Sequence, residues 1–256
     1  MSPLPGTGAA PASSAAASAP AIDRRNLVFD TLGREICAGV IAPQATFTTE
    51  SIESRFQVSR PVVREALRAL EAQGLITPKR RVGVRVLPLT DWNVYDLQVI
   101  RWRLAGPSRV AQLRSLTELR GAIEPAAARM AAMRAPLNQA SDLVGLAGRL
   151  WAAGREGDAE KFLDLDKEFH SLILTMSGNE MFAQLHHLVA EVLTGRTQYD
   201  LMPQYPAPEA LQMHVDIATA IQTGNADKAA ASMVAIMDRT LLEMSSIWEQ
   251  EAPIVG

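Results

Sequence analysis

The 256-residue sequence is poor in cysteine, and Cys37 is the only one. A single thiol cannot form an intramolecular disulfide, so a disulfide-stapled secreted domain is excluded and a reducing compartment is expected. Cys37 follows Ile36 in the predicted first helix, which favours a small buried hydrophobe; a redox-active thiol is the alternative. No apolar run approaches the roughly 18–20 residues of a membrane-spanning helix, so no membrane partner is expected.

Residues 1–21 lack charged side chains and contain few large apolar ones. A stretch this rich in Ala, Ser, Pro and Gly cannot bury enough apolar surface to fold, so it is predicted to be a disordered tail. It also lacks the charged start and the leucine-rich centre of a secretion signal. We therefore expect a cytoplasmic protein.

The chain also lacks an overall positive charge, because its formal net charge is −3. The charges are unevenly distributed, however. Residues 23–88 carry 11 Lys and Arg against 7 Asp and Glu, whereas the rest of the chain carries 14 against 21. Any binding to nucleic acid is therefore expected from the small basic N-terminal segment.

The clearest helical pattern lies between Val58 and Ile76. Apolar residues recur there at spacings of three and four, at Val63, Ala66, Leu67 and Leu70. Arginines at a spacing of four lie off this stripe, at Arg60, Arg64 and Arg68. A short helix docked by one side, with arginines on the other, is suited to a DNA major groove. A surface helix with solvated charges is the alternative.

The flanking residues favour the DNA-binding interpretation. Ser59 can cap this helix, Pro61 fits its first turn, and Gly74 can end it. Residues 48–56 are predicted to form another short helix, and the three residues 57–59 join the two. This is the spacing of a helix-turn-helix.

Residues 75–86 predict two short strands around a basic turn. The turn contains Lys79, Arg80 and Arg81, and Gly83 follows, as a tight turn would favour. A basic hairpin beside a helix-turn-helix is a wing, whose cationic tip can reach phosphates or a minor groove.

Residues 27–86 resemble the winged-helix domain of GntR-type bacterial transcription regulators. The shared motifs are Gly-x-x-x-Pro, Val-Ser-Arg, Val-Arg-Glu-Ala-Leu, Gly-Leu and a wing glycine, at 39–43, 58–60, 63–67, 74–75 and 83. Together, the helix pattern, the basic turn and the resemblance predict DNA-binding residues at Ser59, Arg60, Arg64, Arg68, Lys79, Arg80, Arg81 and Gly83. Two departures are Ser51, where an arginine often contacts DNA, and Val82 at the wing tip. They imply a lost phosphate contact and a different operator preference.

Beyond residue 88 there is little strand signal. Residues 89–107 are predicted to form a helical connector, and helical periodicity then recurs over 108–134, 138–155, 158–176, 179–198, 207–222 and 226–249. The expected fold is mainly α: a winged helix-turn-helix domain over 22–88 and an all-α bundle of six to seven helices over 108–250.

The predicted helix 158–176 carries two polar residues, Asp166 and His170, on its apolar side. Polar groups on a buried face must be paired or must bind something. An Asp oxygen and a His nitrogen four residues apart lie side by side, which suits a divalent metal. A hydrogen bond between the two residues is the alternative.

His214 and Arg120 also lie on apolar faces of predicted helices. The structural alternatives are a His214 satisfied within the core and an ion pair between Arg120 and Glu124. Three such groups in one bundle favour a shared polar cavity over three separate structural contacts.

Residues 108–245 resemble the FCD ligand-sensing domain of FadR-type GntR regulators, in the stretches 119–128, 166–179 and 214–224. Many FCD domains bind a divalent metal through one Asp and three His, and a carboxylate effector completes the shell. The resemblance assigns Asp166, His170 and His214 to three of these ligands, but Ile236 stands where the fourth is expected. Three ligands can still hold Zn²⁺ with an open position. A cavity that has abandoned metal and binds effector directly is the alternative.

The connector and Arg120 resemble, more loosely, galactonate-responsive regulators of sugar-acid catabolism. This implies that Arg120 faces the effector carboxylate, which a guanidinium binds with two hydrogen bonds. We therefore expect a dimeric, nucleoid-associated repressor that binds a palindromic DNA operator and responds to a small carboxylate, such as a sugar acid. The alternatives are a metal-dependent hydrolase or lyase that uses the Asp-His-His set, and a constitutive DNA-bound scaffold with a vestigial cavity.

Overall fold

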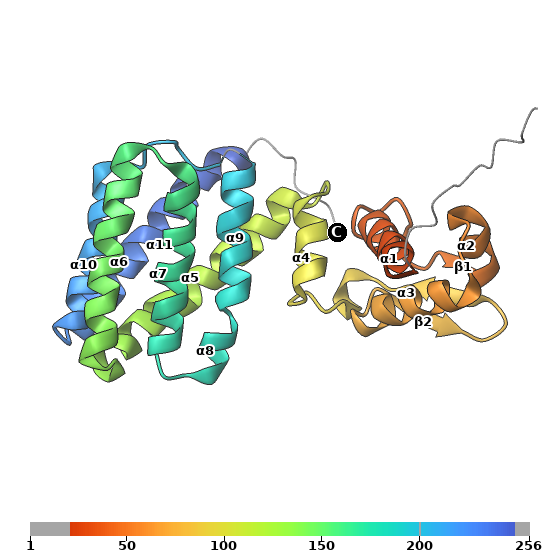
Figure 1. The fold of residues 1–256 in the computed structure, drawn as a ribbon, viewed down its shortest axis with the longest axis horizontal. Coiled ribbons are helices and arrows are strands. Elements are labelled where there is room, and N and C mark those ends of the chain that lie inside the picture. The colour runs from red at the N-terminus through yellow and green to blue at the C-terminus, as the bar shows by residue number, and fades with distance from the viewer. Residues whose placement is uncertain (1–20, 200, 249–256) are drawn as a thin grey trace, which may run out of the picture.

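The computed structural model describes residues 21–199 and 201–248. They form a small N-terminal lobe and a larger helical bundle, with helix α4 between them (Figure 1). The mainly α architecture, a winged helix followed by an all-α bundle, is confirmed. Of the tail predicted over 1–21, all but Ala21 lies outside the described residues, as do residues 249 and 250 of the predicted bundle.

The N-terminal lobe is a winged helix-turn-helix. Its elements in chain order are α1 (Ala21–Cys37), β1 (Thr46–Phe47), α2 (Thr49–Phe56), α3 (Arg60–Ala72), β2 (Ile76–Lys79) and β3 (Gly83–Val86). The strands form an antiparallel sheet in the order β1-β3-β2, with Ile76 opposite Val86 and Thr46 opposite Arg85. The two wing strands were expected. The pattern missed β1, because a strand of two residues carries no periodicity.

Helices α1, α2 and α3 and the sheet share one apolar core. The predicted stripe of α3 is buried in this core together with Leu32 and Ile36 of α1 and Ile52 of α2. Cys37 belongs to the same cluster, which confirms that it is a packed hydrophobe. Burial raises the pKa of its thiol to about 12, because the thiolate would lose its hydration.

The connector is less helical than predicted. A single 3₁₀ turn, η1 (Leu89–Asp91), precedes five residues without helical structure, and α4 (Leu97–Leu104) follows. The physical reason lies at Asp96, whose carboxylate accepts the backbone N–H groups of Gln98 and Val99 at 2.8 and 3.1 Å and so starts a new helix.

The C-terminal bundle begins at α5. Its helices are α5 (Arg109–Arg134), α6 (Leu137–Glu156), α7 (Ala159–Met176), α8 (Glu180–Gln184), α9 (His186–Gln198), α10 (Pro208–Gln222) and α11 (Ala226–Trp248). The prediction of one continuous helix over 179–198 is wrong, because the helix is interrupted at Leu185. There the backbone N–H bonds three residues back, to the carbonyl of Phe182, and this tighter turn separates α8 from α9.

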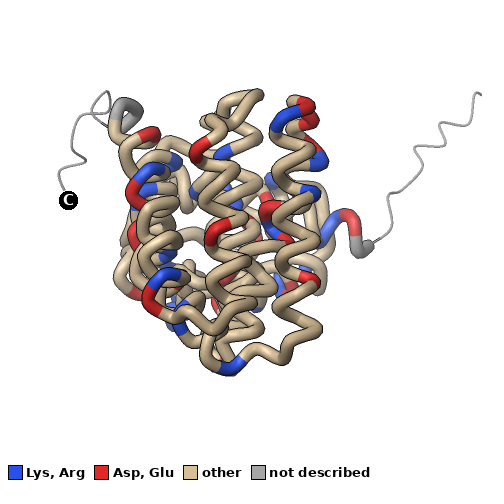
Figure 2. Tube along the Cα trace, turned by 90° about the vertical axis from the view of Figure 1, so that its left-hand side faces the viewer, with Lys and Arg blue, Asp and Glu red and all other residues tan. Residues whose placement is uncertain are grey.

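Within the bundle, α5 packs along α11, α10 lies between α6 and α11, and α7 contacts α5, α6 and α9. Seen from the bundle end of the molecule, Lys and Arg are intermixed with Asp and Glu along the helices (Figure 2). None of the described helices is both long and apolar enough to cross a bilayer.

Helix α4 is buried on two sides. Val99 and Trp102 belong to the core of the winged helix, whereas Ile100 and Leu104 pack in a separate cluster with residues of α5, α9 and α11. The Trp102 indole N–H donates to Asp30 of α1 at 2.6 Å. On the other side, Arg101 pairs with Glu191 of α9 at 2.5 Å. The connector therefore bonds to both lobes.

Candidate DNA-binding face and effector cavity

Helix α3 presents its arginines to solvent. Its apolar stripe is buried, and Arg60, Arg64 and Arg68 are exposed, as the two-faced pattern predicted. Arg60 lies 3.4 Å from a carboxylate oxygen of Glu50, and Arg68 lies 2.8 Å from one of Glu65. Exposed pairs of this kind contribute little stability, so the arginines can exchange these partners for phosphates or base edges.

The structure corrects one detail at the start of this helix. Ser59 occupies the N-cap position, but its side chain makes no capping hydrogen bond. Pro61, in the first turn, has no N–H, so one of the two donors that a cap normally uses is absent. The exposed Ser59 hydroxyl is therefore not engaged in a cap.

The wing lies next to α3, and the two line a common cleft. Lys79, Arg80 and Arg81 are exposed at its tip. Arg81 has a φ of 64° and Gly83 one of 110°. A Cβ on Gly83 would lie 2.3 Å from the backbone oxygen of Phe47, so the glycine lets β1 approach β3. That packing role was not part of the prediction for Gly83.

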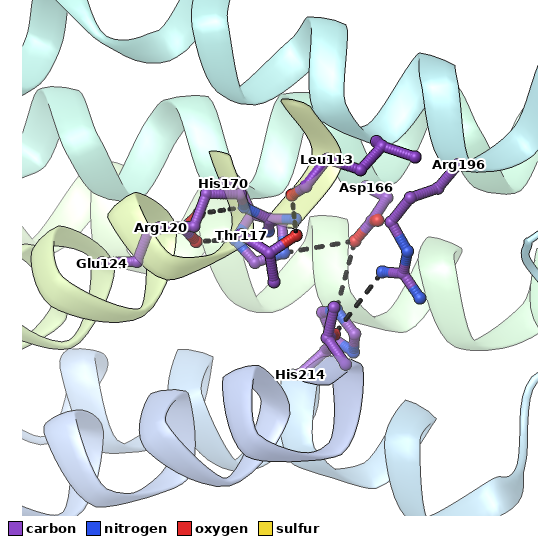
Figure 3. A network of polar contacts seen from close by, with 9 residues as sticks. Leu113, Thr117, Arg120, Glu124, Asp166, His170, Arg196 and His214 are labelled. Atoms are coloured by element: carbon purple, nitrogen blue, oxygen red, sulfur yellow. Dashed lines mark hydrogen bonds and ion pairs between the residues drawn. The ribbon is translucent and has the colours of Figure 1, made fainter. Parts of the chain in front are cut away.

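The polar residues predicted in the bundle come together from three helices (Figure 3). Asp166 and His170 project from α7, His214 from α10 and Arg120 from α5, and all four are buried. One Asp166 oxygen lies 3.4 Å from Nε2 of His170 and 3.2 Å from Nε2 of His214. Asp166 therefore contacts both histidines, and the alternative ion pair between Arg120 and Glu124 is also present, with Nε of Arg120 donating to Glu124 at 2.5 Å.

Glu124 extends this network and was not predicted as part of the site. Its second oxygen pairs with Nδ1 of His170. Burial by itself raises the pKa of Glu124, but the charges of Arg120 and His170 outweigh it and hold the value at about 2. Burial alone would lower the pKa of His170, yet Glu124 and Asp166 raise it to about 9. The two carboxylates therefore favour the imidazolium form of His170.

The arrangement fits a divalent metal. Ligand atoms of Asp166, His170 and His214 lie within 4.8 Å of one another. The Nδ1–H of His214 donates to the carbonyl of Ala210 at 2.8 Å, and Nδ1 of His170 faces Glu124. Metal-binding histidines are typically oriented in this way, with the outer ring nitrogen bonded to a carbonyl or carboxylate. Both Nε2 atoms are left facing Asp166, and a metal would replace the proton on that of His170.

A small cavity of about 50 Å³ adjoins the network. Arg120, Asp166, His170 and His214 line it, and so does the apolar Ile236. Part of the wall comes from the segment 202–207, which is outside any helix or strand.

Sequence reasoning missed several cavity residues: Arg196 of α9 and Arg239, Thr240 and Glu243 of α11. Arg196 is buried, and it follows Val192 and Leu193 at helical spacings. A cation on an apolar stripe was the signal that identified Arg120, and it was equally present at Arg196.

Both halves of the chain match known families. Residues 25–86 match bacterial regulatory proteins of the gntR family, and residues 115–239 match the FCD domain. The chain belongs to the GntR family. Such regulators bind operator DNA and small-molecule effectors. The family match decides against the hydrolase or lyase alternative for the Asp-His-His set, so this GntR regulator is not an enzyme.

Relatives of this GntR regulator include repressors. It is 29% identical to the galactonate operon transcriptional repressor of Escherichia coli K12, over 88% of this chain and 99% of that one. It is 27% identical to the transcriptional repressor RspR of the same strain, over 80% and 82%. Among solved structures, Listeria monocytogenes Lar has a TM-score of 0.55 at 16% identity, over 89% of this chain and 97% of that one. At that identity the likeness shows the fold alone.

Proposed function

We propose that this GntR regulator is a repressor whose operator binding is weakened by a small organic acid, most simply a sugar acid. The observation that carries the proposal is the cavity, which is lined by Arg120 and by the Asp166, His170 and His214 cluster. A cation and a potential metal site at one cavity call for an anionic, oxygen-rich ligand. The galactonate operon repressor among the relatives supports a sugar acid.

At the DNA, Arg60 and Arg64 of α3 are proposed to read base edges in the major groove. Lys79, Arg80 and Arg81 would contact phosphates or the adjacent minor groove. A second copy of the chain would present the same face, so a homodimer would bind the two half-sites of a palindromic operator.

In the cavity, Asp166, His170 and His214 would hold a divalent metal, with Zn²⁺ preferred by this donor set. When bound, the metal supplies an open coordination position for a carboxylate or hydroxyl oxygen. Arg120 orients the acid through its free Nη1 group, which has no hydrogen-bond partner among the described residues. Because the cavity is small, a six-carbon acid must displace part of the wall, and the irregular segment 202–207 is the part best able to move.

The connector offers a route from the cavity to the DNA-binding lobe. Helix α9 contributes Arg196 to the cavity and Glu191 to the pair with Arg101 of α4. Helix α4 in turn inserts Trp102 against α1. A shift of α9 on effector binding would therefore move α4 and change the position of α3 relative to the operator.

The test uses an operator obtained by selection from random DNA, with fluorescence anisotropy in the presence of a panel of sugar acids that includes galactonate. An active acid should weaken operator binding by about 5–150-fold, the usual range of allosteric coupling. Arg120→Met should keep operator affinity and lose the response. The control is Arg149→Met, which removes an exposed arginine of α6. Release of DNA by Arg120→Met at wild-type acid concentrations would show that Arg120 is structural.

A further inference from the structure

Arg196 is a buried cation that the metal-centred arrangement does not use. Its side chain is 5% exposed and extends from α9 toward Asp166 and His214 (Figure 3). One of its terminal nitrogens donates to Glu243 at 3.2 Å, and the other donates to the Thr240 hydroxyl at 3.4 Å. Its Nε has no hydrogen-bond partner within the described ranges. A buried N–H donor without an acceptor is destabilising, so an added acceptor at this Nε–H group would be favourable.

Arg120 has the same kind of unmet donor. Its Nε is bonded to Glu124, whereas its Nη1 has no partner in the described part of the chain. Both arginines line one cavity. Burial lowers the pKa of Arg196, and the nearby charge of Arg120 lowers it further, so the two guanidinium groups repel each other.

On the α11 side of the cavity, two arginines share one carboxylate. Glu243 is the acceptor for Arg196 and, at 2.9 Å, for Arg239. One carboxylate therefore serves two guanidinium groups. An anion between Arg120 and Arg196 would accept both unmet N–H donors and relieve the repulsion.

We propose that Arg120 and Arg196 form a two-arginine clamp that binds one carboxylate group without requiring a metal. The inference rests on the proposed effector site and specifies how that site recognises its ligand. The apolar Ile236 in the cavity wall supports this proposal. Because Ile236 cannot bind a metal, a second arginine would strengthen the binding of an anion that the metal site holds less well. With this clamp, side chains of the protein bind the anion directly, and no metal ion is needed.

The test follows thermal unfolding of the full chain with formate, whose small size suits the cavity as it stands. Formate is compared with sodium chloride at equal ionic strength, with and without EDTA. Wild type should be stabilised by formate equally in both conditions. Arg196→Met should bind formate at least tenfold more weakly. This variant should fold, because Glu243 keeps Arg239 as a partner. Arg196→Lys should also bind weakly, since an ammonium cannot fork onto a carboxylate.

The control is Arg129→Met, which removes an exposed arginine that pairs with Asp227 away from the cavity. Its formate response should equal that of wild type. The clamp is overturned if formate fails to stabilise wild type, if it stabilises Arg196→Met as strongly, or if EDTA abolishes the effect. If formate binds through Arg196 but no sugar acid releases DNA, the clamp stands and the proposed effector class fails.

Discussion

The contact between α1 and the connector gives the sharpest prediction. Gly33 of α1 is buried against Trp102, and a Cβ at Gly33 would lie 2.1 Å from the indole ring. The ring cannot easily move, because it is 1% exposed, packs edge-on against Phe29 at 5.0 Å and donates to Asp30. Gly33→Ala should therefore push α1 and α4 apart.

The magnitude follows from two opposed effects. Replacing a helical glycine by alanine gains about 1 kcal/mol of helix propensity. Overpacking a well-filled contact costs about 1–3 kcal/mol. Gly33→Ala should thus be destabilising by about 1 kcal/mol. The matched control is Gly148→Ala, because Gly148 is exposed on α6 and a Cβ there meets nothing within 4 Å. The control should stabilise by about 1 kcal/mol.

Differential scanning calorimetry separates the two variants. A difference of about 2 kcal/mol corresponds to about 4–8 °C in Tm for a chain of this size. Trp102→Phe in the Gly33→Ala background should recover part of the loss, giving a coupling of at least about 0.5 kcal/mol in a double-mutant cycle. If Gly33→Ala raises Tm as much as Gly148→Ala does, the tight contact between α1 and α4 is refuted.

Four other outcomes are expected. Arg64→Ala should weaken operator binding by about 1–3 kcal/mol if Arg64 reads a base edge, and its circular dichroism spectrum should be unchanged. Arg80→Ala should instead reduce the salt dependence of operator affinity by about one phosphate contact. If both variants bound the operator as tightly as wild type, these roles would be contradicted. Ile236→His should tighten Zn²⁺ binding by at least about tenfold, whereas Ile236→Leu should not, as measured by competition with a chelating dye. Cys37, whose pKa burial raises to about 12, should resist iodoacetamide at pH 8 in the native protein and react once denaturant unfolds the chain; rapid native labelling would show an accessible thiol.

The sequence alone determined the fold class and the face that α3 presents. The spacing of its apolar residues and arginines is local, since the 3.6-residue period of a helix fixes which side chains share a face. For the same reason, the pattern placed Asp166 and His170 together on α7. The errors in secondary structure arose where local hydrogen bonds, which periodicity does not reveal, set the ends of helices. Examples are the Asp96 cap, which places the start of α4 at Leu97, and the tight turn at Leu185.

Only the tertiary structure decided which groups meet across helices. Nothing within α9 indicates that Arg196 reaches Thr240 and Glu243, which lie 44 and 47 residues further along the chain. Nor could the sequence show that His170 faces Glu124, because their contact requires α7 to pack on α5. Helix periodicity fixes the side of a helix, but the depth and rotation of packed helices depend on the whole core. The cavity and the charged groups that line it are therefore set by the packing of the helices.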